Sequence, residues 1–165
     1  MDEASFRLFY ERSAPKLFAY LLRVSGERGL AEDLLQEAYC RFLSSKVPEM
    51  DEASQRSYLF RVATNLMRDR WRRHQETSVP ESFPEPASAS PQLDRQLALR
   101  QAFQQLKVRE RELLWLAYVE GSNHKEIAEA TGVRSASVRP LLFRARRRLA
   151  DLIRGGTSSE TERSK

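Results

Sequence analysis

The chain has 165 residues, of which 41% are hydrophobic and 31% charged, and its formal net charge is +5. No run approaches the roughly 18 consecutive apolar residues of a membrane-spanning helix, and the amino-terminal residues lack the basic start and apolar stretch of a secretory signal, so we expect a cytoplasmic protein. Cys40 is the one cysteine, which excludes an internal disulfide and a paired-cysteine zinc site.

Helical periodicity dominates residues 1–74. Apolar residues recur at three- and four-residue steps over residues 6–21 and again over residues 31–43, and Gly26 and Gly29 interrupt the pattern between them. This spacing predicts two amphipathic helices separated by a short turn.

A third helix is predicted from Ser57 to His74. The segment from Ser44 to Gln55, which contains Pro48, indicates a loop or a short irregular helix before it. The predicted inward face of the third helix consists of Leu59, Val62, Ala63 and Leu66.

Residues 75–92 have a different composition. They contain four of the seven prolines, three acidic residues and no basic residue. Such a segment buries too little apolar surface to offset its ordering entropy, so we expect a flexible acidic linker. The net charge is +2 in residues 1–74, −3 in the linker and +6 in residues 93–165, so a basic part lies on each side.

Helical patterns resume at residue 93 and continue to residue 154. Ser122 and Asn123 offer an N-cap for one of these helices. The last helix is predicted to end before Gly155, which leaves residues 155–165 as a polar, disordered tail. Strand-like alternation is absent, so the predicted fold is all-α, with two small helical domains over residues 1–74 and 93–154.

The segment from Lys125 to Val138 has the spacing of a helix-turn-helix. Ala128 is a small residue where two helices would cross, and Gly132 follows four positions later in the turn. Ser135 or Ser137 offers a cap for the second helix. The apolar seam between the helices would consist of Ile127, Val133, Val138 and Leu141. An ordinary helical hairpin is the alternative interpretation.

The second helix of this motif carries candidates for DNA contact. The residues placed to reach base edges are Arg134, Ser135, Ala136 and Arg139, and the guanidinium of Arg139 has the fork that pairs with guanine. A basic stem for phosphate contacts follows at Arg144, Arg146, Arg147 and Arg148. Because proline is tolerated only in a first turn, Pro140 favours a helix that begins at Ser137.

Two polar stripes occur in the first domain. Helical spacing places Asp33, Gln36, Glu37 and Cys40 opposite the apolar face of their helix, although an ordinary solvated surface would look the same. The third helix aligns Arg61, Asn65, Arg68 and Arg72 and interleaves Tyr58, Phe60 and Trp71. Cations beside aromatic rings are typical of single-stranded nucleic-acid sites. The alternative is that the aromatic residues belong to the core.

Taken together, residues 5–74 and 93–154 resemble the extracytoplasmic-function (ECF) group of bacterial sigma factors. Residues 31–39 are similar to the polymerase-binding helix of that family and residues 58–69 to its promoter-melting helix. Residues 110–149 are similar to its carboxyl-terminal DNA-reading domain. The order and the spacing of these segments match the family pattern.

The resemblance implies partners and contacts. The partners would be RNA polymerase core, promoter DNA and, as often in this family, an anti-sigma factor. The core partner would include its β′ clamp helices and its β subunit. Asp33, Gln36 and Glu37 would contact the clamp helices. Contact with the −10 region would come from Arg61, Asn65, Arg68 and Arg72. Contact with the −35 element would come from Arg134, Ser135, Arg139, Arg144, Arg146 and Arg147.

The resemblance also implies roles for the loop before the third helix and for the linker. The loop around residues 48–54 would capture an unstacked base of the non-template strand, and the linker would pass near the RNA exit path. The chain departs from the family where Arg139, Pro140 and Leu141 replace a Lys-Ser-Arg-like run, and where Lys107-Val108 replaces a Leu-Pro helix start.

Two other functions compete with this interpretation. A conventional DNA-binding regulator would use the helix-turn-helix but would leave the stripe from Asp33 to Glu37 unexplained. A degenerate sigma-like protein that sequesters a partner would be compatible with Pro140. An enzyme is not expected, because the sequence offers no nucleophile–base pair, phosphate-binding glycine loop or metal-ligand spacing. For the same reason no cofactor or metal is expected.

Overall fold

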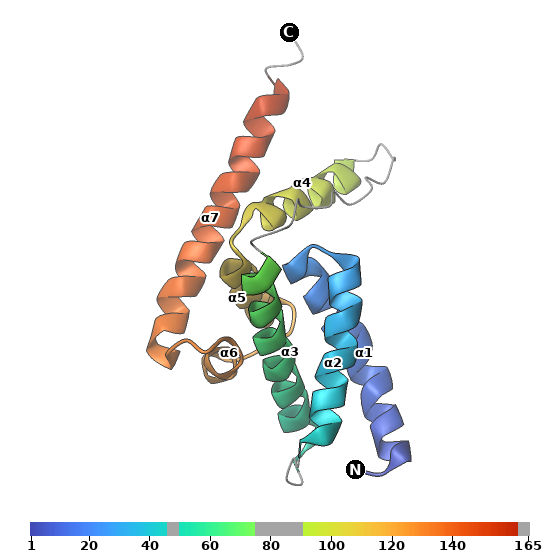
Figure 1. The fold of residues 1–165 in the computed structure, drawn as a ribbon. Coiled ribbons are helices and arrows are strands. Elements are labelled where there is room, and N and C mark those ends of the chain that lie inside the picture. Colours follow the sequence, from blue (N-terminus) through green and yellow to red (C-terminus); the bar gives the residue numbers. More distant parts are fainter. Residues whose placement is uncertain (46–49, 75–90, 162–165) are drawn as a thin grey trace.

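The computed structural model describes residues 1–45, 50–74 and 91–161. In these residues the chain forms seven α-helices and no strand (Figure 1), which confirms the all-α fold. The helices are α1 (Glu3–Ser25), α2 (Arg28–Ser44), α3 (Glu52–His74), α4 (Pro91–Gln105), α5 (Val108–Tyr118), α6 (His124–Thr131) and α7 (Ser135–Thr161). None of the described helices is long and apolar enough to cross a membrane.

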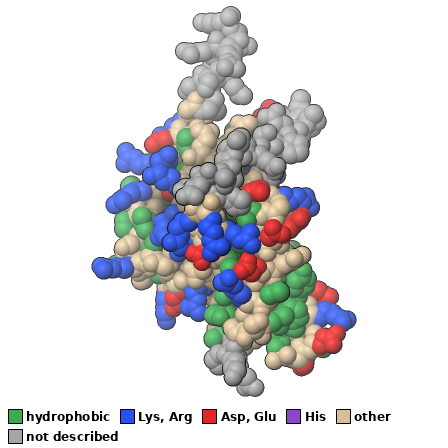
Figure 2. All heavy atoms as spheres, in the orientation of Figure 1, with side chains coloured by type: hydrophobic (Ala, Val, Ile, Leu, Met, Phe, Trp, Pro, Cys, Tyr) green, Lys and Arg blue, Asp and Glu red, His purple; other side chains and the backbone are tan. Residues whose placement is uncertain are grey.

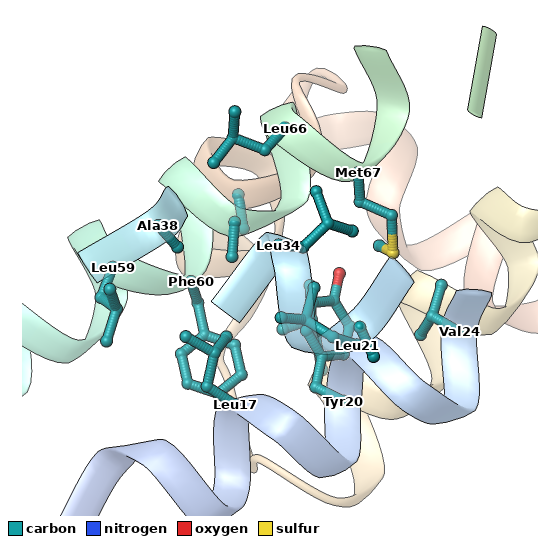
Figure 3. Close-up of a cluster of buried hydrophobic side chains, with 14 of the residues drawn as sticks. Leu17, Tyr20, Leu21, Val24, Leu34, Ala38, Leu59, Phe60, Leu66 and Met67 are labelled. Carbon is teal, nitrogen blue, oxygen red and sulfur yellow. The ribbon is translucent and has the colours of Figure 1, made fainter. Parts of the chain in front are cut away.

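Helices α1, α2 and α3 pack side by side and form the first lobe. Its core combines side chains from all three helices, with Leu17 and Tyr20 of α1 close to Phe60 of α3 (Figure 3). Two buried hydroxyl pairs satisfy the polar atoms of this core: Tyr20 with Thr64 at 2.9 Å, and Ser13 with Tyr39 at 2.6 Å. Burial of hydrogen-bonded hydroxyls avoids the cost of unpaired polar groups.

The ends of these helices depend on local hydrogen bonds. Gly26 ends α1 in the left-handed conformation, with a φ of 74°, which confirms the predicted break there. The second predicted break is wrong, because Gly29 lies in the first turn of α2. Helix α3 begins at Glu52 instead of Ser57, because the Asp51 carboxylate accepts a hydrogen bond from the Ser54 amide at 2.8 Å.

Helices α4 to α7 form the second lobe, and α6 and α7 form a helix-turn-helix. Asn123 caps α6 by accepting from the Glu126 amide at 2.9 Å. Gly132 has a φ of 71° in the turn, as its position in the motif predicts. Of the predicted seam residues, Ile127 of α6 and Val138 of α7 are fully buried, which confirms them, and Val133 and Leu141 are half-buried against the same cluster.

Two predictions about α7 are wrong. The helix begins at Ser135, so Pro140 lies in its second turn. Pro140 has no backbone N–H to donate to the Ala136 carbonyl one turn earlier. Both residues are exposed, so water can satisfy this carbonyl. Helix α7 also continues past Gly155 to Thr161, because a glycine costs only about 1 kcal/mol in a helix that is already formed. Residues 162–165 of the predicted tail lie outside the described residues.

The linker prediction falls mostly outside the described residues. Residues 75–90 are not among them, and α4 already includes residues 91 and 92. The predicted loop over residues 48–54 is described only from residue 50. The structure places residues 52–54 in α3, so the loop prediction is wrong for these three residues, and residues 46–49 lie outside the described residues.

The two lobes pack against each other. Helix α3 lies against α6, and α1 lies against α5 (Figure 1). Buried side chains of both lobes form one continuous apolar cluster. The periodicity of the sequence predicts each lobe but not this contact between them.

The N-cap of α6 gives a first testable prediction. We expect Asn123→Ala to lower the free energy of unfolding by about 1 kcal/mol, because the Glu126 amide loses its side-chain acceptor. His124→Ala, at the exposed neighbouring position, is the matched control. Urea denaturation followed by circular dichroism measures both variants, and equal losses would contradict a capping role for Asn123.

Candidate nucleic-acid and protein interfaces

The acidic stripe of α2 lies on the surface. Helices α1 and α3 pack on the apolar side of α2, so Asp33 and Gln36 point to solvent and are exposed. Glu37 is half-buried, and its carboxylate lies 2.7 Å from Arg41 Nη2 and 3.5 Å from Arg70 Nη2. The structure therefore brings the three predicted residues to one face, with Glu37 already paired to two arginines.

The two arginine partners of Glu37 do not prevent it from binding another cation. Ion pairs between partly exposed side chains contribute little net stability, because water competes for both groups. A basic partner surface can therefore replace Arg41 and Arg70 at small cost. The stripe is suited to a positively charged protein face.

Three of the four predicted residues of the α3 stripe lie on an accessible face. Asn65 and Arg72 are exposed, and Arg72 pairs with Asp69 at 2.6 Å. Arg61 is half-buried, with its guanidinium carbon 5.1 Å from the centre of the Tyr58 ring. A cation over an aromatic face combines charge with a flat apolar surface, the combination that single-stranded nucleic acid requires.

Arg68, the fourth residue of the stripe, lies between the lobes. Its side chain is 24% exposed, and its Nε lies 3.7 Å from the Glu112 carboxylate of α5. Its Nη2 donates to the Ala130 carbonyl of α6 at 3.4 Å. The second lobe therefore partly covers the stripe at Arg68.

The aromatic residues of α3 divide between core and surface. Phe60 is buried, with its ring centre 5.4 Å from that of Tyr20, so the core alternative holds for this residue. Tyr58 is half-buried. Trp71 is half-buried as well, with the Arg111 guanidinium 5.9 Å from its ring centre. Phe60 cannot stack on a base in this structure.

The helix-turn-helix presents its predicted contact residues to solvent. Arg134 and Ser135 at the start of α7, and Arg139 one turn later, are exposed. The stem residues Arg144, Arg146, Arg147 and Arg148 are also exposed, and basic side chains gather on the side of the molecule along which α7 runs (Figure 2). Two of them already have partners in the protein: Arg146 donates to the Tyr118 hydroxyl at 2.8 Å, and Arg148 lies 3.7 Å from Glu110.

Glu112 is a charged residue that the sequence does not mark as special. It is fully buried between the lobes. Burial raises the pKa of its carboxyl to about 7, although the nearby Arg68, Arg109 and Arg111 oppose this shift. The sequence around Glu112, with Arg111 before it and Leu113 after it, does not predict that this carboxyl is buried.

Within the described side chains of residues 1–45, 50–73 and 92–155, no three acidic, histidine or cysteine side chains gather into a group that could hold a metal ion. The candidate sites are an acidic stripe on α2, a basic stripe with aromatic residues on α3 and a basic helix-turn-helix.

Comparison with known families matches both lobes. The family model for Sigma-70 region 2 matches residues 9–77, and the model for Sigma-70, region 4 matches residues 96–149. The first match contains both polar stripes, and the second contains the helix-turn-helix.

Individual relatives agree with these matches. The chain is 30% identical to the ECF RNA polymerase sigma factor SigM of Bacillus subtilis over 158 residues, which cover 92% of this chain and 96% of SigM. It is 31% identical to the RNA polymerase sigma factor CarQ of Myxococcus xanthus over 156 residues, covering 90% of this chain and 89% of CarQ.

A solved structure shows the same fold. The sigma factor RpoE of Bartonella quintana, crystallised with the anti-sigma factor NepR, aligns with a TM-score of 0.63 and 22% identity, covering 91% of this chain and 97% of that one. The two family models together match well over half of the sequence. The chain therefore belongs to the sigma-70 family of RNA polymerase sigma factors, within its ECF group.

Proposed function

We propose that this chain binds RNA polymerase core in the cytoplasm and directs promoter-specific initiation of transcription. The observation that supports this most is the presence, in one chain, of an exposed acidic stripe on α2, a basic stripe on α3 and a basic helix-turn-helix. A conventional regulator needs only the last of these. Bond formation belongs to the polymerase, and the chain contributes binding and strand separation.

The first lobe contacts the core in this proposal. Asp33, Gln36 and Glu37 face the β′ clamp helices, and the Glu37 carboxylate exchanges its present arginine partners for basic groups of the polymerase. The exposed position of Asp33 and Gln36 on α2 supports this role.

The neighbouring α3 contacts the −10 region. Asn65 is exposed and can hydrogen-bond an unpaired base, while Arg61 and Arg72 follow the phosphate backbone. Arg68 joins them once it is released from Glu112.

The second lobe reads the −35 element with α7. Arg134, Ser135 and Arg139 lie at the amino-terminal end of this helix and are exposed, as a recognition helix in the major groove requires. The stem residues Arg144, Arg146 and Arg147 contact phosphates and position the helix without reading sequence.

A phosphate contact has a distinct signature in salt dependence. We expect Arg147→Ala to weaken binding to all DNA sequences and to lower the slope of log affinity against log salt by about 0.9, because one phosphate contact is lost. Arg95→Ala removes the same charge from an exposed position on α4 and is the control. Fluorescence anisotropy at several salt concentrations measures both, and an unchanged slope in Arg147→Ala would remove this residue from the interface.

Run-off transcription tests the proposal as a whole. Purified polymerase core is incubated with genomic fragments from the source organism, with and without the protein. New discrete start sites are expected only when the protein is present, and their alignment reveals whether a −35 element is shared. A protein that binds DNA but neither binds core nor produces start sites would instead be a conventional regulator.

A further inference from the structure

The outer face of α7 is apolar over its first three turns. Ala136, Pro140 and Phe143 follow one another at four- and three-residue steps, which places them on one side of the helix. All three are exposed, and Phe143 is 56% exposed. We call these three residues the apolar stripe of α7. The structure therefore leaves apolar side chains in solvent on the helix proposed to read the −35 element.

The opposite side of α7 holds the helix in its lobe. Val138, Leu142 and Ala145 are buried there and belong to the apolar cluster of the protein. Because these buried side chains hold α7 in place, the lobe does not need the apolar stripe in order to fold. The apolar stripe is therefore available to a partner, and its residues can be changed without unfolding the protein.

The charges around the apolar stripe fit a polyanion. Residues 135–150 contain five arginines and no acidic residue. Arg139 and Arg144 are sequence neighbours of the stripe residues, Arg147 lies one turn beyond Phe143 on the same side, and all three arginines are exposed. A helix face of this kind fits the major groove, where anionic phosphates border the base edges. Charge complementarity therefore favours DNA over a protein surface as the partner of the apolar stripe.

The chemistry of the apolar stripe limits what it can read. The side chains of alanine, proline and phenylalanine neither donate nor accept hydrogen bonds. In the major groove the C5-methyl group of thymine is the apolar feature that distinguishes one base pair from another, and alanine and phenylalanine side chains contact it. Arg139 recognises guanine through hydrogen bonds instead. The apolar stripe therefore offers a kind of readout that the polar residues of α7 do not supply.

The length of the apolar stripe matches a short run of base pairs. Phe143 lies seven positions after Ala136, which is about 10 Å along the helix axis at about 1.5 Å per residue. Base pairs are stacked about 3.4 Å apart, so a helix that lies along the groove places the apolar stripe over about three of them. Pro140 lies between the two ends, and its ring continues the apolar surface there.

We propose that the apolar stripe of α7 reads thymine methyl groups in the major groove of the −35 element. This inference rests on the proposed function and adds to it a determinant of promoter choice. The promoters that this chain recognises are then expected to share a short run of thymines in the −35 region, on one strand or the other. Ala136, Pro140 and Phe143 contact their methyl groups, and the neighbouring arginines hold the helix on the phosphates.

Replacing thymine by uracil tests this contact, because deoxyuridine keeps the base pairing and the charge of thymidine but lacks the C5-methyl group. The probe is a duplex promoter fragment, mapped by run-off transcription, in which the thymines of the −35 region are replaced one at a time. We expect replacement of a contacted thymine to weaken binding by polymerase core with this chain about fourfold, the effect of one buried methyl group. Fluorescence anisotropy measures the affinity. Unchanged affinity at every position, or a shared −35 element without thymine, would overturn the inference.

Variants of the apolar stripe assign the readout to α7. Phe143→Ala and Pro140→Ser are each expected to bind thymine and uracil equally at the position that the replaced side chain contacts, with core binding unchanged. Leu99→Ala, at an exposed apolar position of α4 outside the helix-turn-helix, is the matched control and should distinguish thymine from uracil as the wild type does. The same discrimination in the wild type and in both stripe variants would overturn the role of the apolar stripe.

The outcomes separate this inference from the proposed function. A chain that binds core and produces start sites but does not distinguish uracil from thymine keeps the proposed function and overturns the inference. Loss of core binding in Phe143→Ala with unchanged discrimination would make the apolar stripe a protein contact, which also overturns the inference. A chain that produces no start sites with core would overturn the proposed function itself, and the inference with it.

Discussion

Replacing both Asp33 and Glu37 by lysine is expected to abolish binding to RNA polymerase core. Both side chains lie on the stripe proposed to face the clamp helices, and charge reversal juxtaposes like charges at a cost of several kcal/mol, which corresponds to a loss of affinity of 100-fold or more at about 1.4 kcal/mol per tenfold. The fold should survive, since Asp33 is exposed and the ion pairs of Glu37 are partly exposed. Retention of the chain on immobilised core measures the loss.

Glu32→Lys is the matched control for this double variant. Glu32 is an exposed residue of α2 outside the stripe, and it pairs with Arg28 at 3.0 Å. We expect it to retain core binding and helicity. Wild-type affinity in the Asp33→Lys, Glu37→Lys double variant would remove the α2 stripe from the polymerase interface.

Features that depend on local sequence were predictable. The helix-turn-helix follows from residues within one short segment: Asn123 caps α6, Gly132 takes a φ that other residues rarely adopt, and Ile127 is buried against α7. These effects need only neighbouring residues. The three helices of the first lobe follow for the same reason, from regular apolar spacing.

The ends of the helices were less predictable, because small local differences decide them. A single hydrogen bond from the Ser54 amide to Asp51 accompanies a start of α3 five residues before Ser57. Pro140 is tolerated in the second turn of α7 where both it and Ala136 are exposed, so that water can satisfy the Ala136 carbonyl; the sequence does not reveal this exposure.

The contact between the lobes was not predictable from the sequence. Arg68 has the spacing of a surface residue, and its burial arises only when α5 and α6, which follow the linker, come against α3. Glu112 likewise lies in a charged segment, and it is fully buried where α5 packs against α1, with Arg68 of α3 3.7 Å away. The contact roles of the stripe residues stay predictions that the variants test.

Arg68 is the stripe residue whose role is hardest to test alone. Its Nε lies 3.7 Å from the Glu112 carboxylate, and its Nη2 donates to the Ala130 carbonyl. Variants of Arg68 would therefore change the contact between the lobes as well as any contact with DNA, and the function of the stripe is better tested at residues outside the lobe contact.

The double substitution Asn65→Ala, Arg72→Ala is expected to lower the formation of open promoter complexes by about 100-fold while leaving core binding unchanged. A lost contact to a base edge costs about 1–3 kcal/mol, and the lost phosphate contact of Arg72 adds to it. Both side chains are exposed, and the Arg72–Asp69 ion pair lies on the surface, so the fold should be unaffected. Permanganate reactivity of unpaired thymines in the promoter measures strand opening.

The neighbour of Arg72 supplies a sharp control. Arg73 is also exposed on α3 and carries the same charge, but it lies outside the stripe, so Arg73→Ala should open the promoter nearly as well as the wild type. A template with an unpaired −10 segment should reduce the defect of the double variant, because the cost of separating the strands is then removed before binding. Equal defects in Arg72→Ala and Arg73→Ala would mean that only the overall charge of α3 matters, and would contradict a defined DNA-binding stripe.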